Sequence, residues 1–149
     1  MLRQVTVSET ALAAMREHAA SDLPRECCGL LAGREGAITH WVRISNSLAS
    51  EREFFMDPSE LIRALRSFRE LGLGHLGIYH SHPSGASFPS RRDVEMAFYP
   101  SIAYFIISPA SAPKRQVRAF SIVEGIAAEL ELRVTHARNA DLQIQARGL

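Results

Sequence analysis

Apolar residues recur at helical spacing in three parts of the chain. Ser8 is a suitable N-cap for the first part, and Asp57 followed by Pro58 is typical of the start of the second. Glycines near residue 72 end that second stretch. Ser90 is a suitable N-cap for a third, shorter stretch. The pattern predicts helices over residues 8–19, 57–72 and 90 to about 98.

Shorter apolar runs between these stretches predict strands. The run after Glu26 is bounded by the tight turn Gly33-Arg34-Glu35-Gly36, so the next run is expected to return as its hairpin partner. The segment 83–89 holds two prolines and is expected to be irregular. Strands are predicted over residues 27–32, 38–44, 52–56, 76–79 (continuing into 80–82), 102–108, 116–123 and 127–134.

Strands joined both by hairpins and by helices predict an α/β fold in the broad sense, strictly α+β. We expect a single mixed sheet, partly curled, with helices packed on it. A length of 149 residues suits one domain. We assign residues 1–135 to that domain and residues 136–149 to a polar C-terminal tail, either helical or loose.

Composition narrows the class of protein. An apolar share of 46% and a charged share of 22% are those of an ordinary globular chain. The net charge of +1 gives no bulk attraction to nucleic acid or anionic lipid. No apolar run approaches the roughly 18 residues of a membrane span, and the N-terminus lacks the plan of a signal peptide. We therefore expect no nucleic-acid partner, no membrane and a cytoplasmic location.

Candidate chemistry lies where the 76–79 strand ends. His80 and His82 are two residues apart, so their side chains project from the same face of a strand, and Pro83 keeps His82 extended. Asp93 follows in the first turn of the third helix, after a loop long enough to bring it back beside them. Two histidines and one aspartate leave a fourth tetrahedral position for water, as in catalytic zinc sites. Zinc there lowers the pKa of that water to about 7.

Two further residues complete this hypothesis. Glu26 stands at the mouth of an apolar strand and is the best candidate for a carboxylate that accepts a proton without binding the metal. Ser90, one turn before Asp93, could donate a hydrogen bond to a developing oxyanion.

Each of these residues also has an ordinary structural interpretation. The histidines could be half-buried strand residues, Glu26 a surface acid, and Asp93 the acidic partner of a helix cap. Taken together, His-x-His with Ser and Asp at fixed offsets arises by chance in roughly one such sequence in a thousand. Cys27 and Cys28 are interpreted as reduced thiols on opposite sides of a strand, the alternative being a thiolate ligand or redox switch.

The segment HSHP at 80–83, six residues, and SRRD at 90–93 match the pattern HxHPx(6)SxxD without a gap. With Glu26 upstream in ECCGLLAG, the chain resembles the JAMM metalloprotease motif of catalytic MPN domains over about residues 3–125. The resemblance implies the MPN/JAMM architecture, which is similar to that of cytidine deaminases. It also implies that His80, His82 and Asp93 bind one Zn²⁺, that Glu26 is the general acid/base and that Ser90 steadies the tetrahedral intermediate.

The resemblance further implies hydrolysis of a peptide or isopeptide bond after the C-terminal glycine of a ubiquitin-like protein. Small prokaryotic members act on ubiquitin-like sulfur carriers, some releasing cysteine in sulfur metabolism. The expected partner is therefore a carrier ending in Gly-Gly, and a homodimer is compatible with the pattern. We expect the 83–89 loop to border the cleft, with Phe88 either a substrate-binding wall or an anchor to the core.

Two alternatives remain at this point. The chain could be a non-catalytic MPN scaffold or binding module, although a scaffold has no physical need for the intact ligand set. It could also be a non-haem iron oxygenase with two histidines and one carboxylate, although the spacing differs from the usual one. Metal content and identity separate these classes.

Overall fold

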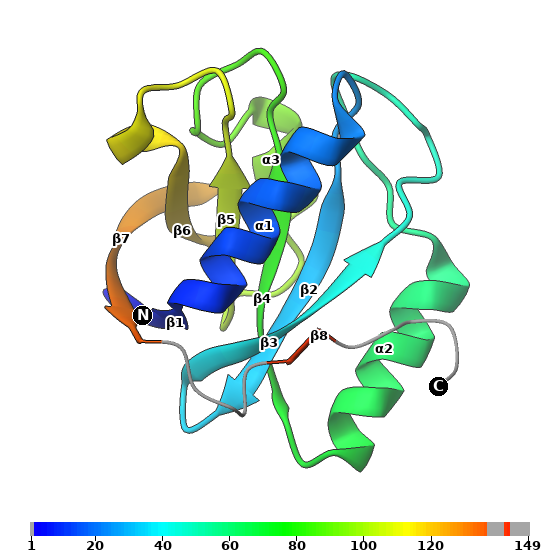
Figure 1. Ribbon diagram of the computed structural model, residues 1–149, viewed down its shortest axis with the longest axis vertical. Coiled ribbons are helices and arrows are strands. Elements are labelled where there is room, and N and C mark those ends of the chain that lie inside the picture. The colour runs from blue at the N-terminus through cyan, green and yellow to red at the C-terminus, as the bar shows by residue number, and fades with distance from the viewer. Residues whose placement is uncertain (1, 137–141, 144–149) are drawn as a thin grey trace.

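Within residues 2–136 and 142–143, which the computed structural model describes, eight strands and three α-helices form one α+β unit (Figure 1). The strands are β1 (Gln4–Ser8), β2 (Cys28–Arg34), β3 (Ala37–Ile44), β4 (Gly74–Ser81), β5 (Ala103–Ile107), β6 (Val117–Val123), β7 (Ile126–Thr135) and β8 (Leu142–Gln143). The helices are α1 (Glu9–Asp22), α2 (Pro58–Glu70), α3 (Arg91–Glu95) and the 3₁₀ turn Pro113–Arg115.

The strands form one mixed sheet in the order β1-β7-β6-β5-β4-β2-β3-β8. The two edges are joined, because β1 pairs in parallel with β7 along its whole length and with β3 at Thr6 and Val7. The sheet therefore closes on itself through β1, which confirms the predicted mixed, curled sheet. β4 is central, antiparallel to β2 and parallel to β5.

Each face of the sheet has its own apolar core. On one face α1 packs against the strands through Leu12 and Met15, and this core includes Cys27 and Tyr79. On the other face α2 packs through Ala64 and Phe68, in a core that includes Cys28 and Ile78. Figure 1 shows α1 crossing the sheet and α2 lying beside β3 and β4.

The predicted helix starts are confirmed by their caps. The Ser8 hydroxyl accepts a hydrogen bond from the Ala11 N–H, and the Asp57 carboxylate accepts one from the Glu60 N–H. α2 ends before Gly72, whose φ of +70° favours glycine. These caps satisfy backbone groups that a helix end leaves without partners.

One predicted strand is absent, one predicted helix is shorter, and one strand was missed. The strand predicted over residues 52–56 does not form apart from an isolated bridge between Met56 and Asn46, because the Asn46 side chain bonds the Phe55 N–H and the Glu53 carbonyl in place of a strand ladder. The third helix ends at Glu95 rather than near residue 98, and the Tyr104 hydroxyl bonds the Tyr99 backbone in the irregular stretch that follows. No strand was predicted before α1, where β1 alternates buried and exposed residues.

The predicted polar tail lies mostly outside the described residues. Of its three described residues, Leu142 and Gln143 pair in parallel with His40 and Trp41 of β3, and His136 Nδ1 lies 3.1 Å from Glu9 Oε1. The assignment of residues 136–149 to a separate tail stays a prediction. None of the described helices combines the length and the apolarity needed to span a bilayer.

Candidate metal centre

The two predicted histidines stand at the end of the central strand. His80 belongs to β4, between Cys28 of β2 and Ile106 of β5, and is buried. His82 lies just beyond β4, and its N–H donates to the Ile107 carbonyl at 2.8 Å, which continues the pairing with β5. Both imidazoles therefore project from the same face, as the strand alternation predicts.

Asp93 is positioned by the first turn of α3. The Ser90 hydroxyl accepts a hydrogen bond from the Asp93 N–H at 3.1 Å, and Asp93 Oδ2 accepts one from the Ser90 N–H at 2.9 Å. This reciprocal capping box orients the carboxylate back toward β4. The cap interpretation and the ligand interpretation of Asp93 are thus compatible, because the same oxygen serves both.

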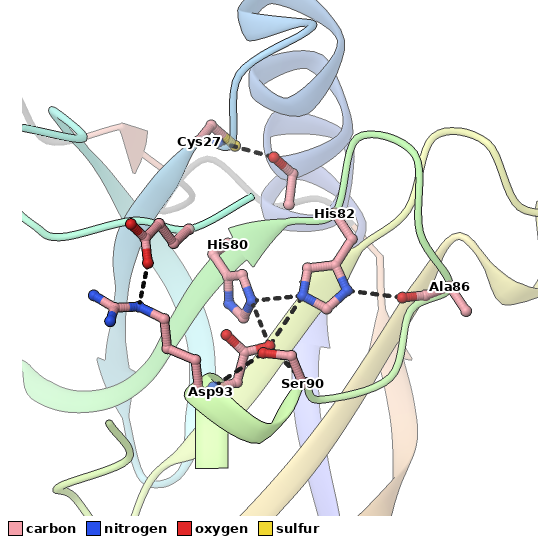
Figure 2. Close-up of polar contacts among 9 residues, drawn as sticks. Cys27, His80, His82, Ala86, Ser90 and Asp93 are labelled. Carbon is pink, nitrogen blue, oxygen red and sulfur yellow. Dashed lines mark hydrogen bonds and ion pairs between the residues drawn. The ribbon is translucent and has the colours of Figure 1, made fainter. Parts of the chain in front are cut away.

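Figure 2 shows the three side chains converging. His80 Nε2 lies 3.0 Å from His82 Nε2, and Asp93 Oδ2 lies 3.1 Å and 3.0 Å from those two nitrogens. His82 Nδ1 is 2.8 Å from the Ala86 carbonyl, which can only accept, so this nitrogen carries a proton and leaves the Nε2 lone pair available. Two imidazole nitrogens and one carboxylate oxygen gathered in this way fit the ligand set of a zinc ion.

The electrostatics favour the metal-binding protonation states of Asp93 and His80, whereas those of His82 favour its protonated form. Burial alone would raise the pKa of Asp93, but its hydrogen bonds to His80 and His82 hold that pKa well below the ordinary value. Burial lowers the pKa of His80. Burial also opposes charge on His82, but its bonds to Asp93 and to the Ala86 carbonyl raise its pKa above the ordinary value. An ionised carboxylate and imidazoles are the forms that act as ligands.

Glu26 is buried beside this centre, with 4% of its surface exposed. Its backbone is fixed by the Ser50 carbonyl and by the Asn46 side chain. Its Oε1 atom has no hydrogen-bond partner among the described residues. Burial raises the pKa of Glu26 to about 7, and the charges of Asp93 and Glu53 act in the same direction. A carboxylate of this kind can take up and release a proton near neutral pH.

Three of the predicted residues line an open groove, here named the polar groove because most of its lining residues are polar. Glu26, His82 and Ser90 all line it, and its remaining walls come from Glu51, Arg52 and residues 83–85. The structure thus brings together the five polar residues singled out in the sequence, although they come from three separate segments.

The matching family model is that of prokaryotic homologues of the JAB domain, over residues 8–123. The chain belongs to this family. It is 32% identical to the CysO-cysteine peptidase of Mycobacterium tuberculosis over 118 residues, covering 78% of this chain and 81% of the relative. It is 38% identical to the desampylase of Haloferax volcanii over 104 residues, covering 68% and 75%.

A solved structure agrees with this assignment. The solution structure of a Desulfitobacterium hafniense protein superposes with a TM-score of 0.82 at 34% identity, covering 91% of this chain and 96% of that one. The crystal structure of a JAB1/MPN domain protein from Archaeoglobus fulgidus superposes with a TM-score of 0.56 at 22% identity, covering 87% of this chain and 97% of that one, so the fold is the JAB/MPN fold. With its His80, His82 and Asp93 group, this JAB domain is a metallopeptidase of the JAMM type.

Phe88 of the JAB domain lies on the surface of the 83–90 loop, with 54% of its surface exposed. Its ring meets the Phe120 ring edge-on at 5.3 Å, and the Arg118 guanidinium lies 5.7 Å above it. These contacts anchor the loop to β6. Phe88 is absent from the lining of the polar groove, so its role as a substrate wall stays a prediction.

The two cysteines are buried on opposite faces of the sheet, as predicted. Burial raises the pKa of the Cys27 thiol to about 12 and raises that of Cys28 as well. Neither belongs to the metal-ligand group found among the described residues. Both thiols thus remain protonated at neutral pH and behave as small apolar side chains.

Two residues that shape the site were missed in the sequence. Phe54 stacks on His80 with the ring centroids 4.6 Å apart. Asn46 holds both Glu26 and the segment that carries Phe54 through its side-chain amide. An Asn that follows a strand is a turn signal, but its long-range partners depend on the tertiary structure.

Proposed function

We propose that this JAMM metallopeptidase hydrolyses the peptide or isopeptide bond that follows the C-terminal glycine of a ubiquitin-like or sulfur-carrier protein. Its relatives include a CysO-cysteine peptidase and a desampylase. The observation that carries the proposal is the buried Glu26 carboxyl, whose Oε1 has no hydrogen-bond partner among the described residues, in the same groove as His82 and Ser90.

His80, His82 and Asp93 would hold one zinc ion. Zinc bound there acts as a Lewis acid and supplies hydroxide at neutral pH. The protein's part is to keep Asp93 ionised and the Nε2 atoms of both histidines free of protons. The Ala86 carbonyl supports the second task by fixing the proton of His82 on Nδ1.

Glu26 moves the protons of the reaction. Its carboxylate accepts a proton from the attacking water and then gives it to the leaving amine. A pKa of about 7 suits both steps, because the group is neither too weak a base nor too weak an acid near neutral pH. Burial excludes bulk water from one of its oxygens.

The Ser90 hydroxyl is available as a hydrogen-bond donor. Its oxygen accepts the Asp93 N–H, which leaves the O–H as a donor on the groove side. That donor stabilises the negative charge that develops on the scissile carbonyl oxygen.

The groove suits a glycine-rich tail. Ser84 and Gly85 line one wall, and their side chains are small or absent. A substrate backbone without side chains can therefore come close to the catalytic groups. The wall is anchored, because Ser108 and Arg115 bond the backbone and Ser87 of the 83–89 loop.

The test is the Glu26→Gln variant. We expect this variant to bind one zinc per chain but to lose turnover of a carrier extended by one amino acid after Gly-Gly, by about 100-fold or more. Zinc content and cleavage are measured on the same preparation, with His82→Ala as the matched variant that loses the metal.

Full activity of Glu26→Gln would reject Glu26 as the acid/base. If the wild-type chain bound no zinc after supplementation yet kept its fold, the evidence would favour a scaffold. Tight binding of iron in place of zinc would favour an oxygenase.

A further inference from the structure

A second hollow adjoins the metal centre on the α2 face of the sheet. It is a cavity of about 160 Å³, and apolar side chains make most of its walls. His80 and Asp93 form part of its lining, so it begins at the proposed zinc ligands. Its apolar lining includes Phe54, Phe55, Met96, Phe98 and Tyr99.

The outer rim of this cavity is apolar and faces solvent. Phe98 is 69% exposed and Phe55 is 45% exposed, although both are large apolar side chains. Apolar rims of this kind beside a reactive centre are typical of binding sites that a ligand covers. The rim comes from the segment after α3 and from the segment before α2.

The two hollows share no lining residue, although each is lined by at least one of the metal ligands proposed above. Glu26 and Ser90 line the polar groove with His82, and neither lines the cavity. His80 and Asp93 line the cavity, and neither lines the groove. The substrate bond must lie between them, at the point where the three ligands meet.

The roles of the catalytic groups then set the direction of the substrate. Glu26 gives its proton to the leaving amine, so the leaving group extends along the polar groove. The acyl side of the bond, which is the carrier tail, extends the opposite way toward His80, Asp93 and the cavity.

We propose that the cavity binds the side chain of the residue that precedes the two C-terminal glycines of the carrier, and that this residue is apolar. The inference rests on the proposed function. Each residue of an extended chain advances about 3.3 Å, so this residue is the first one upstream of the bond whose side chain can enter. A cavity of about 150 Å³ lined by apolar groups holds a benzene-sized ligand, which makes leucine a suitable occupant.

The experiment uses four peptides of the form acetyl-Ser-X-Gly-Gly-Z, with X and Z each either leucine or alanine. We expect kcat/KM to be about 10- to 100-fold higher with leucine at X than with alanine. We expect kcat/KM to change by less than about 3-fold when Z is varied between leucine and alanine. The products are separated by chromatography.

Phe98→Ala removes part of the rim and should lower the preference for leucine at X about 5-fold or more, with unchanged zinc content. The control is Val134→Ala, near the end of β7, which removes an exposed apolar side chain whose strand partner Val7 lies outside the cavity lining. It should leave the preference unchanged.

A second readout needs no turnover. The peptide acetyl-Ser-X-Gly-Gly, a product that ends at the second glycine, should bind the zinc-loaded protein about 10-fold more tightly with leucine than with alanine at X. Calorimetry measures this difference.

The outcomes separate this inference from the proposed function. If no peptide and no ubiquitin-like carrier is cleaved, the proposed function fails. If the peptides are cleaved with equal efficiency for both residues at X, only the cavity assignment fails. A preference that follows Z and falls in Phe98→Ala would place the leaving group in the cavity and would overturn the proposed direction.

Discussion

At the scale of single residues, the site depends on side chains that each do two things. Asp93 Oδ2 caps α3 through the Ser90 N–H and also meets both histidines. Ser90 accepts the Asp93 N–H and keeps a hydroxyl proton for the groove. A substitution at such a residue changes both stability and catalysis, and well-chosen pairs of variants separate the two.

Ser90→Ala and Ser90→Gly make such a pair. Loss of a serine N-cap to alanine costs about 1 kcal/mol of unfolding free energy, whereas glycine costs only a few tenths. Loss of one oxyanion donor costs about 10²- to 10³-fold in kcat. We therefore expect both variants to lose the same large part of kcat, while only the alanine variant is measurably less stable in urea.

One outcome of this comparison would contradict the proposed role of Ser90 in the reaction. If kcat fell in proportion to stability and Ser90→Gly stayed nearly fully active, Ser90 would be a helix cap without a part in the reaction.

At the scale of elements, α1 and β4 are joined by a buried polar contact on the face opposite the metal site. His18 Nδ1 lies 2.7 Å from the Tyr79 hydroxyl, and His18 Nε2 lies 3.5 Å from Asp22. Burial lowers the pKa of His18 to about 4, although the charge of Asp22 acts in the opposite direction. The native state thus keeps His18 neutral, whereas the unfolded chain protonates it at its ordinary pKa near 6.5.

This difference predicts a loss of stability in acid. Above pH 6.5 both states hold a neutral His18, and the contribution is fully present. As the pH falls from 6.5 toward 4 the unfolded state binds the proton first, and unfolding becomes easier by about 1–3 kcal/mol. His18→Gln should flatten this part of the curve of unfolding free energy against pH, measured in urea between pH 4 and 8. An unchanged slope in the variant would assign the acid sensitivity to other groups.

At the scale of the whole molecule, the closed sheet supports the site independently of the metal. β4 is paired on both sides, and the cores on the two faces hold it in place. The three proposed ligands come from the end of this strand and from the short helix α3, which has no buried residue. We therefore expect the apo protein to keep its fold and to gain stability when zinc is added.

The size of this gain follows from binding alone. At a zinc concentration a hundred times the dissociation constant, stabilisation is about 2.7 kcal/mol, which for a domain of this size raises Tm by about 5–10 °C. Chelator-treated protein is titrated with zinc, and Tm is followed by fluorescence or calorimetry. The His82→Ala variant should show little or none of this rise. If the Tm of the wild-type protein did not change when zinc was added, the assignment of a zinc site would be contradicted.

Local hydrogen-bond chemistry made much of this protein predictable from its sequence. His80 and His82 share a face because strand side chains alternate, and Asp93 returns to them because it is the third residue of a helix capped by Ser90. The caps at Ser8 and Asp57 start α1 and α2 for the same kind of reason. These features depend on neighbours within a few residues, and such neighbours can be seen in a linear sequence.

Long-range packing decided the rest. The closure of the sheet through β1, the stacking of Phe54 on His80 and the bonds of Asn46 join residues that are distant in sequence. The burial that raises the pKa of Glu26 comes from the folded surroundings, and so does the cavity beside His80 and Asp93. The sequence by itself therefore determined which groups are the candidates for the chemistry and their local order. The tertiary structure alone decided the pKa shifts of these groups and the cavity and groove around them, because burial and cavities arise only when separate segments pack together.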